Sequence, residues 1–194
     1  RQMCIRDRYT IAHLKLGMTL MQTGYTPSSE IRLNIYLTNT LEEPVPLSKW
    51  VPSFISKEAQ ESNYVKTSVP ITVIIGNPPY SGISQNKGDY IVNLLKKELP
   101  TISKSPSYYQ IDGKPLNEKK VWLQDDYVKF IRYSQYLIEK TEIGIIGMIT
   151  NNGFLENPTF RGMRRSLMDS FNKIEIINLH GDSKKKEKAP DGTK

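Results

Sequence analysis

Hydrophobic side chains recur at the spacing of an amphipathic helix in three stretches of the sequence. The first covers residues 11–22 and is followed by Gly24, a residue type that ends helices. The second covers residues 125–140, and the third begins at Asn157, a suitable N-cap, with Pro158 at the first helical position. The predicted core face of the first stretch consists of Ile11, Leu14, Met18 and Met21. That of the third consists of Phe160, Met163, Leu167 and Phe171.

Four further runs predict β-strands. Residues 31–38 alternate between hydrophobic and polar side chains, which is typical of a strand. Residues 71–76 and 143–150 are nearly all apolar, which predicts parallel strands buried on both faces. The glycines at 144 and 147 lie inside a run and lack the spacing of a phosphate loop, so they indicate close packing. A last strand is predicted around residues 174–179.

The intervening segments are less regular. Pro44 and Pro46 open a predicted loop that runs to about Ser68, with a short helix near residues 56–61. Residues 90–99 predict a short helix that ends before Pro100. The rest of residues 81–124 is polar and loop-like. Its aromatic residues either contact nucleic acid or hold the loop to the domain; they are Tyr108, Tyr109 and Trp122.

Bulk composition narrows the class of protein. The chain has 194 residues, of which 38% are hydrophobic and 24% charged, as in a globular domain with a real core. A net charge of +7 suits a polyanionic partner, although many soluble proteins are basic without having one. Cys4 is the single cysteine, so an internal disulfide is excluded and a reducing compartment is favoured. Since no run approaches membrane-spanning length, we expect a cytoplasmic protein with no membrane partner.

The strongest chemical signal is Asn77-Pro78-Pro79-Tyr80, directly after the run at residues 71–76. Because two prolines cannot continue a strand, the chain must turn there. Asn77 and Tyr80 are then held at the carboxyl end of a buried strand, where open α/β sheets bind ligands. An ordinary turn is the alternative interpretation. With the preceding strand and the aromatic fourth residue, the tetrapeptide resembles the catalytic motif of amino-group methyltransferases that use S-adenosylmethionine.

These residue types suit methyl transfer to adenine. The exocyclic amino nitrogen of adenine is a poor nucleophile, because its lone pair is delocalised into the ring. The side-chain oxygen of Asn77 and the carbonyl of Pro78 would accept its two hydrogens and localise that lone pair. Pro79 completes the turn, and Tyr80 would stack on the flipped base, a contact worth about 1–3 kcal/mol. This chemistry requires no metal ion.

A longer resemblance concerns the second half of the chain. Residues 125–131, 144–151, 154–155 and 160–164 resemble later motifs of adenine-specific DNA methyltransferases. Residues 9–16, 35–42 and 179–186 resemble single-polypeptide restriction-modification enzymes of type ISP. Such enzymes combine a nuclease, a translocating helicase, an adenine methyltransferase and a target-recognition domain. The resemblance implies S-adenosylmethionine as cofactor, double-stranded DNA as substrate, and a bacterial or archaeal source.

The resemblance also implies roles for individual residues. Cofactor binding is expected at Thr38, Asn39 and Asn77, although a simple strand cap is the alternative for the first two. Candidate contacts to DNA are Tyr80, Phe154, Arg161, Arg164, Arg165, Lys184, Lys185 and Lys186. The ordinary interpretation is a solvated helix face for the arginines and a mobile surface loop for the three lysines.

The implied fold class is α/β, a partial Rossmann-like class I methyltransferase fold. Residues 31–38, 71–76 and 143–150 would be its third, fourth and fifth strands. The first two strands, which lie between the third and the fourth, are absent together with the glycine-rich cofactor loop, and so is the last strand. We therefore expect residues 9–180 to form a partial methyltransferase domain, inactive by itself. Residues 1–8 resemble a translated sequencing adapter, and residues 181–194 a basic loop leading to a missing C-terminal part.

Two other functions remain open from the sequence. The same tetrapeptide occurs in methyltransferases that act on a glutamine amide of peptide-release factors. The resemblance of residues 125–164 and the basic tail favour DNA instead. The third hypothesis is a non-enzymatic fragment that binds nucleic acid.

Overall fold

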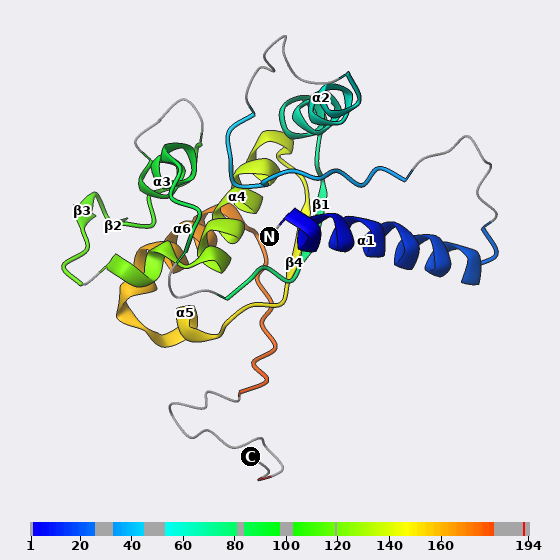
Figure 1. Cartoon of the computed structure of the whole chain (residues 1–194). Helices are drawn as coiled ribbons and strands as arrows, with labels where there is room; N and C mark the ends of the chain where they lie inside the picture. The colour runs from blue at the N-terminus through cyan, green and yellow to red at the C-terminus, as the bar shows by residue number, and fades with distance from the viewer. Residues whose placement is uncertain are drawn as a thin grey trace. The chain divides into compact units, whose positions relative to one another are not determined.

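The computed structural model describes residues 2–25, 33–44, 53–80, 84–97, 103–118, 120–180 and 192 (Figure 1). They belong to two compact units. The first unit comprises Arg1–Thr40 and Pro44–Val69, and the second comprises Leu41–Glu43 and Pro70–Lys194. Within the described ranges, no helix combines the length and the apolar character needed to cross a membrane.

Helix α1 (Gln2–Gln22) confirms the predicted first helix and extends it toward the N-terminus. It ends where Gly24 adopts a φ of 82° and the Tyr25 N–H donates to the Leu20 carbonyl at 3.2 Å. The expected burial of its hydrophobic face was wrong, because the four side chains are 51–62% exposed: Ile11, Leu14, Met18 and Met21. Periodicity marks a face that can be buried but does not supply the surface that covers it.

Helix α2 (Ser53–Ser68) occupies most of the segment predicted to be a loop. The strand predicted at residues 31–38 is also wrong in its described part, since residues 33–39 contain no strand. Their backbone bonds to side chains of α2 instead. The Leu37 N–H donates to Glu58 Oε1 at 3.2 Å, and Lys66 Nζ donates to the Asn39 carbonyl at 2.6 Å. Since side chains satisfy these backbone groups, alternation alone does not create a strand here.

The second unit contains a parallel pair of strands, β1 (Val73–Gly76) and β4 (Ile145–Met148). Both lie inside runs that were predicted as strands, and their pairing confirms the expected neighbours. The ladder continues past β4, where the Ile149 N–H donates to the Gly76 carbonyl at 3.0 Å. The carboxyl ends of both strands therefore lie at the same edge of the sheet.

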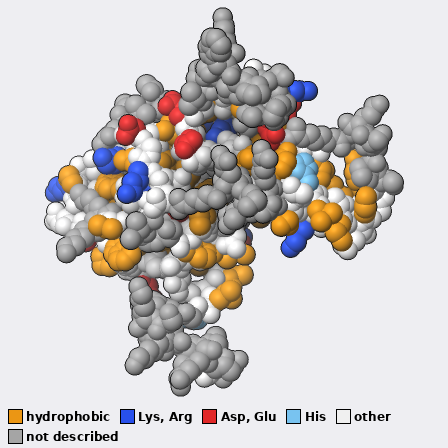
Figure 2. Space-filling view, viewed as in Figure 1, with side chains coloured by type: hydrophobic (Ala, Val, Ile, Leu, Met, Phe, Trp, Pro, Cys, Tyr) orange, Lys and Arg blue, Asp and Glu red, His pale blue; other side chains and the backbone are white. Residues whose placement is uncertain are grey.

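Burial alternates along both strands. One face is half-buried, and the other is exposed, with Ile75 at 84% and Ile145 at 69%. Figure 2 shows hydrophobic side chains, in orange, at the molecular surface. The prediction that these strands are buried on both faces is therefore wrong for this structure, because the described part of the chain covers only one face.

The strand predicted around residues 174–179 is likewise absent, since residues 173–180 contain no strand. The side chains of Ile174, Ile176, Ile177 and Leu179 are 46–88% exposed. A strand needs a neighbour to pair its backbone groups, and the described sheets consist only of the pairs β1–β4 and β2–β3.

Helices α3 (Asp89–Lys96), α4 (Asp126–Thr141) and α6 (Arg161–Ser170) confirm three predicted helices. The predicted N-cap is also confirmed, since Asn157 Oδ1 accepts from the Thr159 N–H at 2.9 Å. This cap begins the short 3₁₀ helix η2 (Pro158–Phe160), which leads into α6 and follows the single turn α5 (Gly153–Glu156).

The segment predicted as irregular contains a small hairpin and a 3₁₀ helix. Strands β2 (Gln110–Ile111) and β3 (Lys114–Pro115) pair antiparallel, and η1 covers Lys120–Gln124. The turn residues Asp112 and Gly113 have φ values of 49° and 75°, as Asp-Gly hairpin turns require. This turn signal stands in the sequence, and the prediction of a loop overlooked it.

Helix α4 lies at the centre of the core of the second unit. One side of it packs with α6, η2 and the segment that carries Tyr108. The cluster consists of Leu95, Tyr108, Leu116, Leu123, Tyr127, Val128, Ile131, Phe160 and Met163. Another side contributes Tyr133 to a cluster with Leu41, Ile91 and Leu94. Tyr108 is completely buried, so it holds its loop to the domain, whereas Trp122 is 48% exposed.

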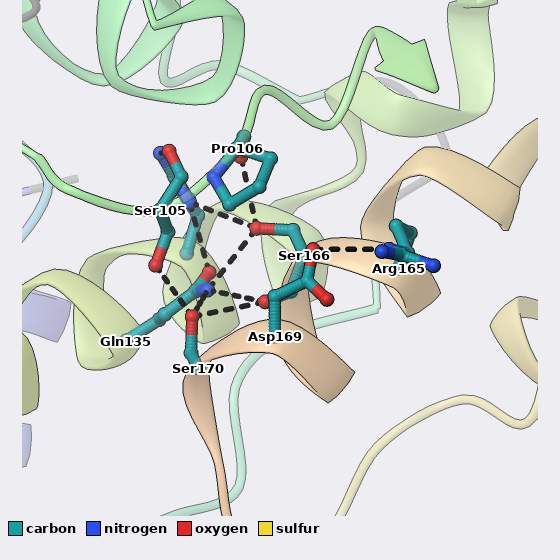
Figure 3. Close-up of polar contacts among 8 residues, drawn as sticks. Ser105, Pro106, Gln135, Arg165, Ser166, Asp169 and Ser170 are labelled. Carbon is teal, nitrogen blue, oxygen red and sulfur yellow. Dashed lines mark hydrogen bonds and ion pairs between the residues drawn. The ribbon is translucent and has the colours of Figure 1, made fainter. Parts of the chain in front are cut away.

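A buried polar network joins α4 to α6 and to the segment before β2 (Figure 3). Arg132 is fully buried and donates to the Leu94 carbonyl at 2.9 Å. Gln135 Nε2 donates to Ser166 Oγ at 3.1 Å, and the Ser166 hydroxyl donates to the Pro106 carbonyl at 2.8 Å. Because a buried guanidinium is costly unless its donors are satisfied, this network specifies how α4 and α6 meet.

Candidate active site

The tetrapeptide Asn77-Pro78-Pro79-Tyr80 begins immediately after the last residue of β1. Pro78 is buried, whereas Asn77, Pro79 and Tyr80 are exposed. The structure thus places the motif where the sequence predicted it, at the carboxyl end of a parallel strand. Asn77 and Tyr80 are therefore exposed to solvent at this edge of the sheet.

Tyr80 connects the ends of the two strands. Its hydroxyl lies 2.7 Å from Asn77 Oδ1 and 3.1 Å from the carbonyl oxygen of Ile149, the residue after β4. A hydroxyl has one hydrogen, so the two acceptors share it. The Asn77 oxygen has two lone pairs, and one remains for a further donor. The Ile149 carbonyl was not among the predicted site residues, because no sequence pattern marks a backbone oxygen.

The turn after β4 lies at the same edge of the sheet. The Gly153 N–H donates to Asn151 Oδ1 at 2.7 Å, and Asn152 Nδ2 donates to Asn178 Oδ1 at 3.4 Å. These contacts order the chain between β4 and α5. Two asparagine-bearing turns therefore follow the two paired strands, at the edge where Asn77 and Tyr80 lie.

The predicted cofactor residues Thr38 and Asn39 belong to the first unit, and Asn77 belongs to the second. Both Thr38 and Asn39 are exposed. The backbone of Asn39 is held by Lys66, through the contact to its carbonyl described above. A cofactor role for these three residues stays a prediction.

The predicted DNA-contacting arginines each have a partner within the chain. Arg161 pairs with Glu118 at 3.0 Å, and Arg165 pairs with Asp169 at 3.0 Å along α6. Arg164 donates to the carbonyl of Phe154 at 2.7 Å, and the Phe154 ring packs against the core. These interactions orient the side chains; DNA contact by any of them remains a prediction. Lys184, Lys185 and Lys186 lie outside the described residues.

Comparison with known sequences shows which family the chain belongs to. The sequence pattern described as Eco57I restriction-modification methylase matches residues 7–184. The chain belongs to this family. The match includes the predicted methyltransferase motifs, so the expected resemblance to restriction-modification methylases is confirmed. Among curated protein sequences, none matches this chain significantly.

Solved structures show the same relationship. This chain resembles the "ATP-dependent Type ISP restriction-modification enzyme LlaBIII bound to DNA", with a TM-score of 0.60 and 26% identity over 82% of its length. It also resembles the "cryoEM structure DrdV-DNA complex", with a TM-score of 0.56 and 26% identity over 84%. A nuclease-deletion mutant of the Type ISP enzyme LlaGI, at 23% identity and a TM-score of 0.58 over 84% of the chain, shares the fold.

This chain spans only a small part of these enzymes. It covers 10% of the LlaBIII chain, 14% of the LlaGI chain and 15% of the DrdV chain. Together with the parallel β1–β4 pair, the matches identify an α/β methyltransferase fold.

Proposed function

We propose that this chain is the catalytic region of an adenine N6-specific DNA methyltransferase in a restriction-modification enzyme. The observation that carries the proposal is the Asn77-Pro78-Pro79-Tyr80 turn at the end of β1, in a chain of a restriction-modification methylase family. An exposed amide oxygen at this place is suited to bind an amino group. Adenine presents such a group, and a flipped adenine would bring it to the turn.

Each residue of the turn has a defined task in this reaction. The Asn77 side-chain oxygen and the Pro78 carbonyl accept the two amino hydrogens of adenine, which concentrates the lone pair on the nitrogen. The ring of Tyr80 is half exposed and offers a surface on which the base stacks. Pro79 keeps the turn from continuing as a strand. Proximity to the methyl donor provides further acceleration.

We infer that the methyl donor is S-adenosylmethionine, which supplies an electrophilic methyl group on its sulfonium. Asn39 and Asn77 both carry exposed amides, and an amide offers a donor and an acceptor for the adenosine part of the donor. Thr38 adds an exposed hydroxyl beside Asn39. The types of groups present therefore fit the cofactor, and each of these residues is proposed as a contact to it.

The substrate is proposed to be double-stranded DNA. Two of the similar structures are DNA complexes of their own proteins, and the net charge of +7 favours a polyanion. Because the chain spans 10–15% of those enzymes, we assign nuclease, helicase and target-recognition functions to other regions of the same polypeptide. We also propose that the chain forms a partial methyltransferase fold, without the first two strands and the last strand.

Replacing Asn77 by Ala in the full-length enzyme tests the proposal. Loss of one positioned acceptor should lower turnover by about a hundredfold to a thousandfold, as for other positioned transition-state groups. The measurement is transfer of labelled methyl groups to duplex DNA, followed by mass spectrometry of the nucleosides. N6-methyladenine is the expected product of the unaltered enzyme. An Asn77→Ala enzyme with normal turnover, or a methylated peptide in place of DNA, would overturn the assignment.

A further inference from the structure

Lys129 carries a buried charge and has no role in the proposed reaction as described so far. It lies on α4 with its side chain 0% exposed. A buried ammonium is costly unless its donors are satisfied. Lys129 Nζ donates to Ser84 Oγ at 2.9 Å and also to the Asn86 carbonyl oxygen. Burial lowers the pKa of Lys129, while the carboxylate of Asp126 opposes this shift.

Asp126 holds the same segment from one turn earlier on α4. Its Oδ1 accepts from the Ser84 hydroxyl at 2.6 Å and from Asn86 Nδ2 at 2.9 Å. Ser84 therefore accepts from the ammonium and donates to the carboxylate, in a continuous chain of charge-assisted hydrogen bonds. Ser84 and Asp126 are both buried. We call Ser84, Asn86, Asp126 and Lys129 the α4 clamp.

The position of the clamp along the chain gives it a role. Ser84 comes four residues after Tyr80, so the clamp holds the chain just downstream of the Asn77–Tyr80 turn. Just upstream, Gly76 is held in β1 by its pairing with β4. The turn therefore lies between two held positions of the chain, Gly76 in the sheet and Ser84 bonded to α4, and both belong to the second unit.

We propose that Lys129 and Asp126 are positioning residues for methyl transfer, which act through Ser84 and Asn86 to keep the Asn77–Tyr80 turn in its reactive conformation. This inference rests on the proposed function. The clamp has no contact with the reacting atoms. It restrains the oxygens of Asn77 and Pro78, whose aim decides how well they orient the amino group. A displacement of about 1 Å at such groups costs a rate factor of about a hundred.

The rate of the folded enzyme distinguishes this role from a purely structural one. Removing one member of a buried charged pair destabilises a fold, because the other charge loses its partner. A Lys129→Met enzyme is therefore expected to unfold at a lower temperature, although Asp126 keeps its bonds from Ser84 and Asn86. A positioning role predicts that the rate is low even well below the thermal transition, whereas a structural role predicts a normal rate there.

The test measures single-turnover methyl transfer by the full-length enzyme. Lys129→Met should lower the rate by about tenfold to a hundredfold. Its affinities for S-adenosylmethionine and DNA, measured well below its thermal transition, should stay unchanged. Lys140→Met is the matched control, because Lys140 is an exposed lysine on the same helix and should leave the rate unchanged.

A second variant keeps the test decisive if Lys129→Met does not fold. Ser84→Ala removes only one hydroxyl and should also lower the rate. Combined with Lys129→Met, it should lower the rate no further, because both changes break the same contact. Independent, multiplying effects would overturn the clamp, as would a normal rate in both single variants. Asn77→Ala in the same assay separates the two proposals: a normal rate there rejects the proposed function itself.

Discussion

At the scale of single residues, Tyr80 combines a bonded hydroxyl with a half-exposed ring. Tyr80→Ala removes both, and we expect it to weaken stacking of the target base by about 1–3 kcal/mol. Its affinity for S-adenosylmethionine should change little. Tyr80→Phe keeps the ring and should retain most base stacking. Fluorescence of 2-aminopurine at the target position, with cofactor binding measured in parallel, checks both variants. Weakened cofactor binding with unchanged base flipping would contradict the assigned role.

The proposed cofactor contact of Asn39 can be tested by changing its side chain without disturbing its backbone contact. Lys66 binds the backbone carbonyl of Asn39, and that contact survives in an Asn39→Ala enzyme. If the amide binds the cofactor, losing it should weaken S-adenosylmethionine binding by about tenfold, as for a hydrogen bond of about 1–1.5 kcal/mol. Titration calorimetry with the full-length enzyme measures this. Unchanged affinity would leave only a capping role for the side chain.

At the scale of elements, Gly162 shows how closely α6 approaches the chain leading into β2. A Cβ at this position would lie 2.5 Å from the Tyr108 carbonyl oxygen and 2.7 Å from that of Gln110. Gly162→Ala should therefore force the backbone apart and lower the free energy of unfolding by about 1–3 kcal/mol. Gly88→Ala is the control, because nothing lies within 4 Å of its Cβ position. Denaturant unfolding compares the two, and equal stabilities would contradict the close approach.

The elements also show where sequence patterns were sufficient. Helices α4 and α6 and the Asn157 cap follow from local spacing and capping, and all three were predicted. The strand at residues 31–38 was not found in its described part, where Glu58 accepts from the Leu37 N–H and no described strand lies beside it. Strand prediction depends on a partner, and no local pattern says whether that partner is present.

At the scale of the whole molecule, the open face of the β1–β4 sheet governs stability. Covering one Val or Ile side chain contributes about 1.5–3 kcal/mol, and the net stability of a domain is only about 5–15 kcal/mol. We therefore expect residues 1–194 alone to be marginally stable and inactive. Thermal unfolding with and without S-adenosylmethionine measures this. A sharp transition that the cofactor raises would show that these residues are self-sufficient.

The sequence by itself determined helices α3, α4 and α6, the runs that become β1 and β4, and the place of Asn77–Tyr80 at a strand end. These features depend on neighbours within a few residues, through periodicity, capping and the geometry of proline. Only the tertiary structure decided which face of the sheet is covered, that Tyr80 reaches Ile149, and that Lys129 and Asp126 hold Ser84. These contacts join residues that lie 42–69 positions apart in the sequence. A buried charge or a strand edge can be satisfied by any suitable group that the fold places beside it. No local pattern therefore specifies these contacts.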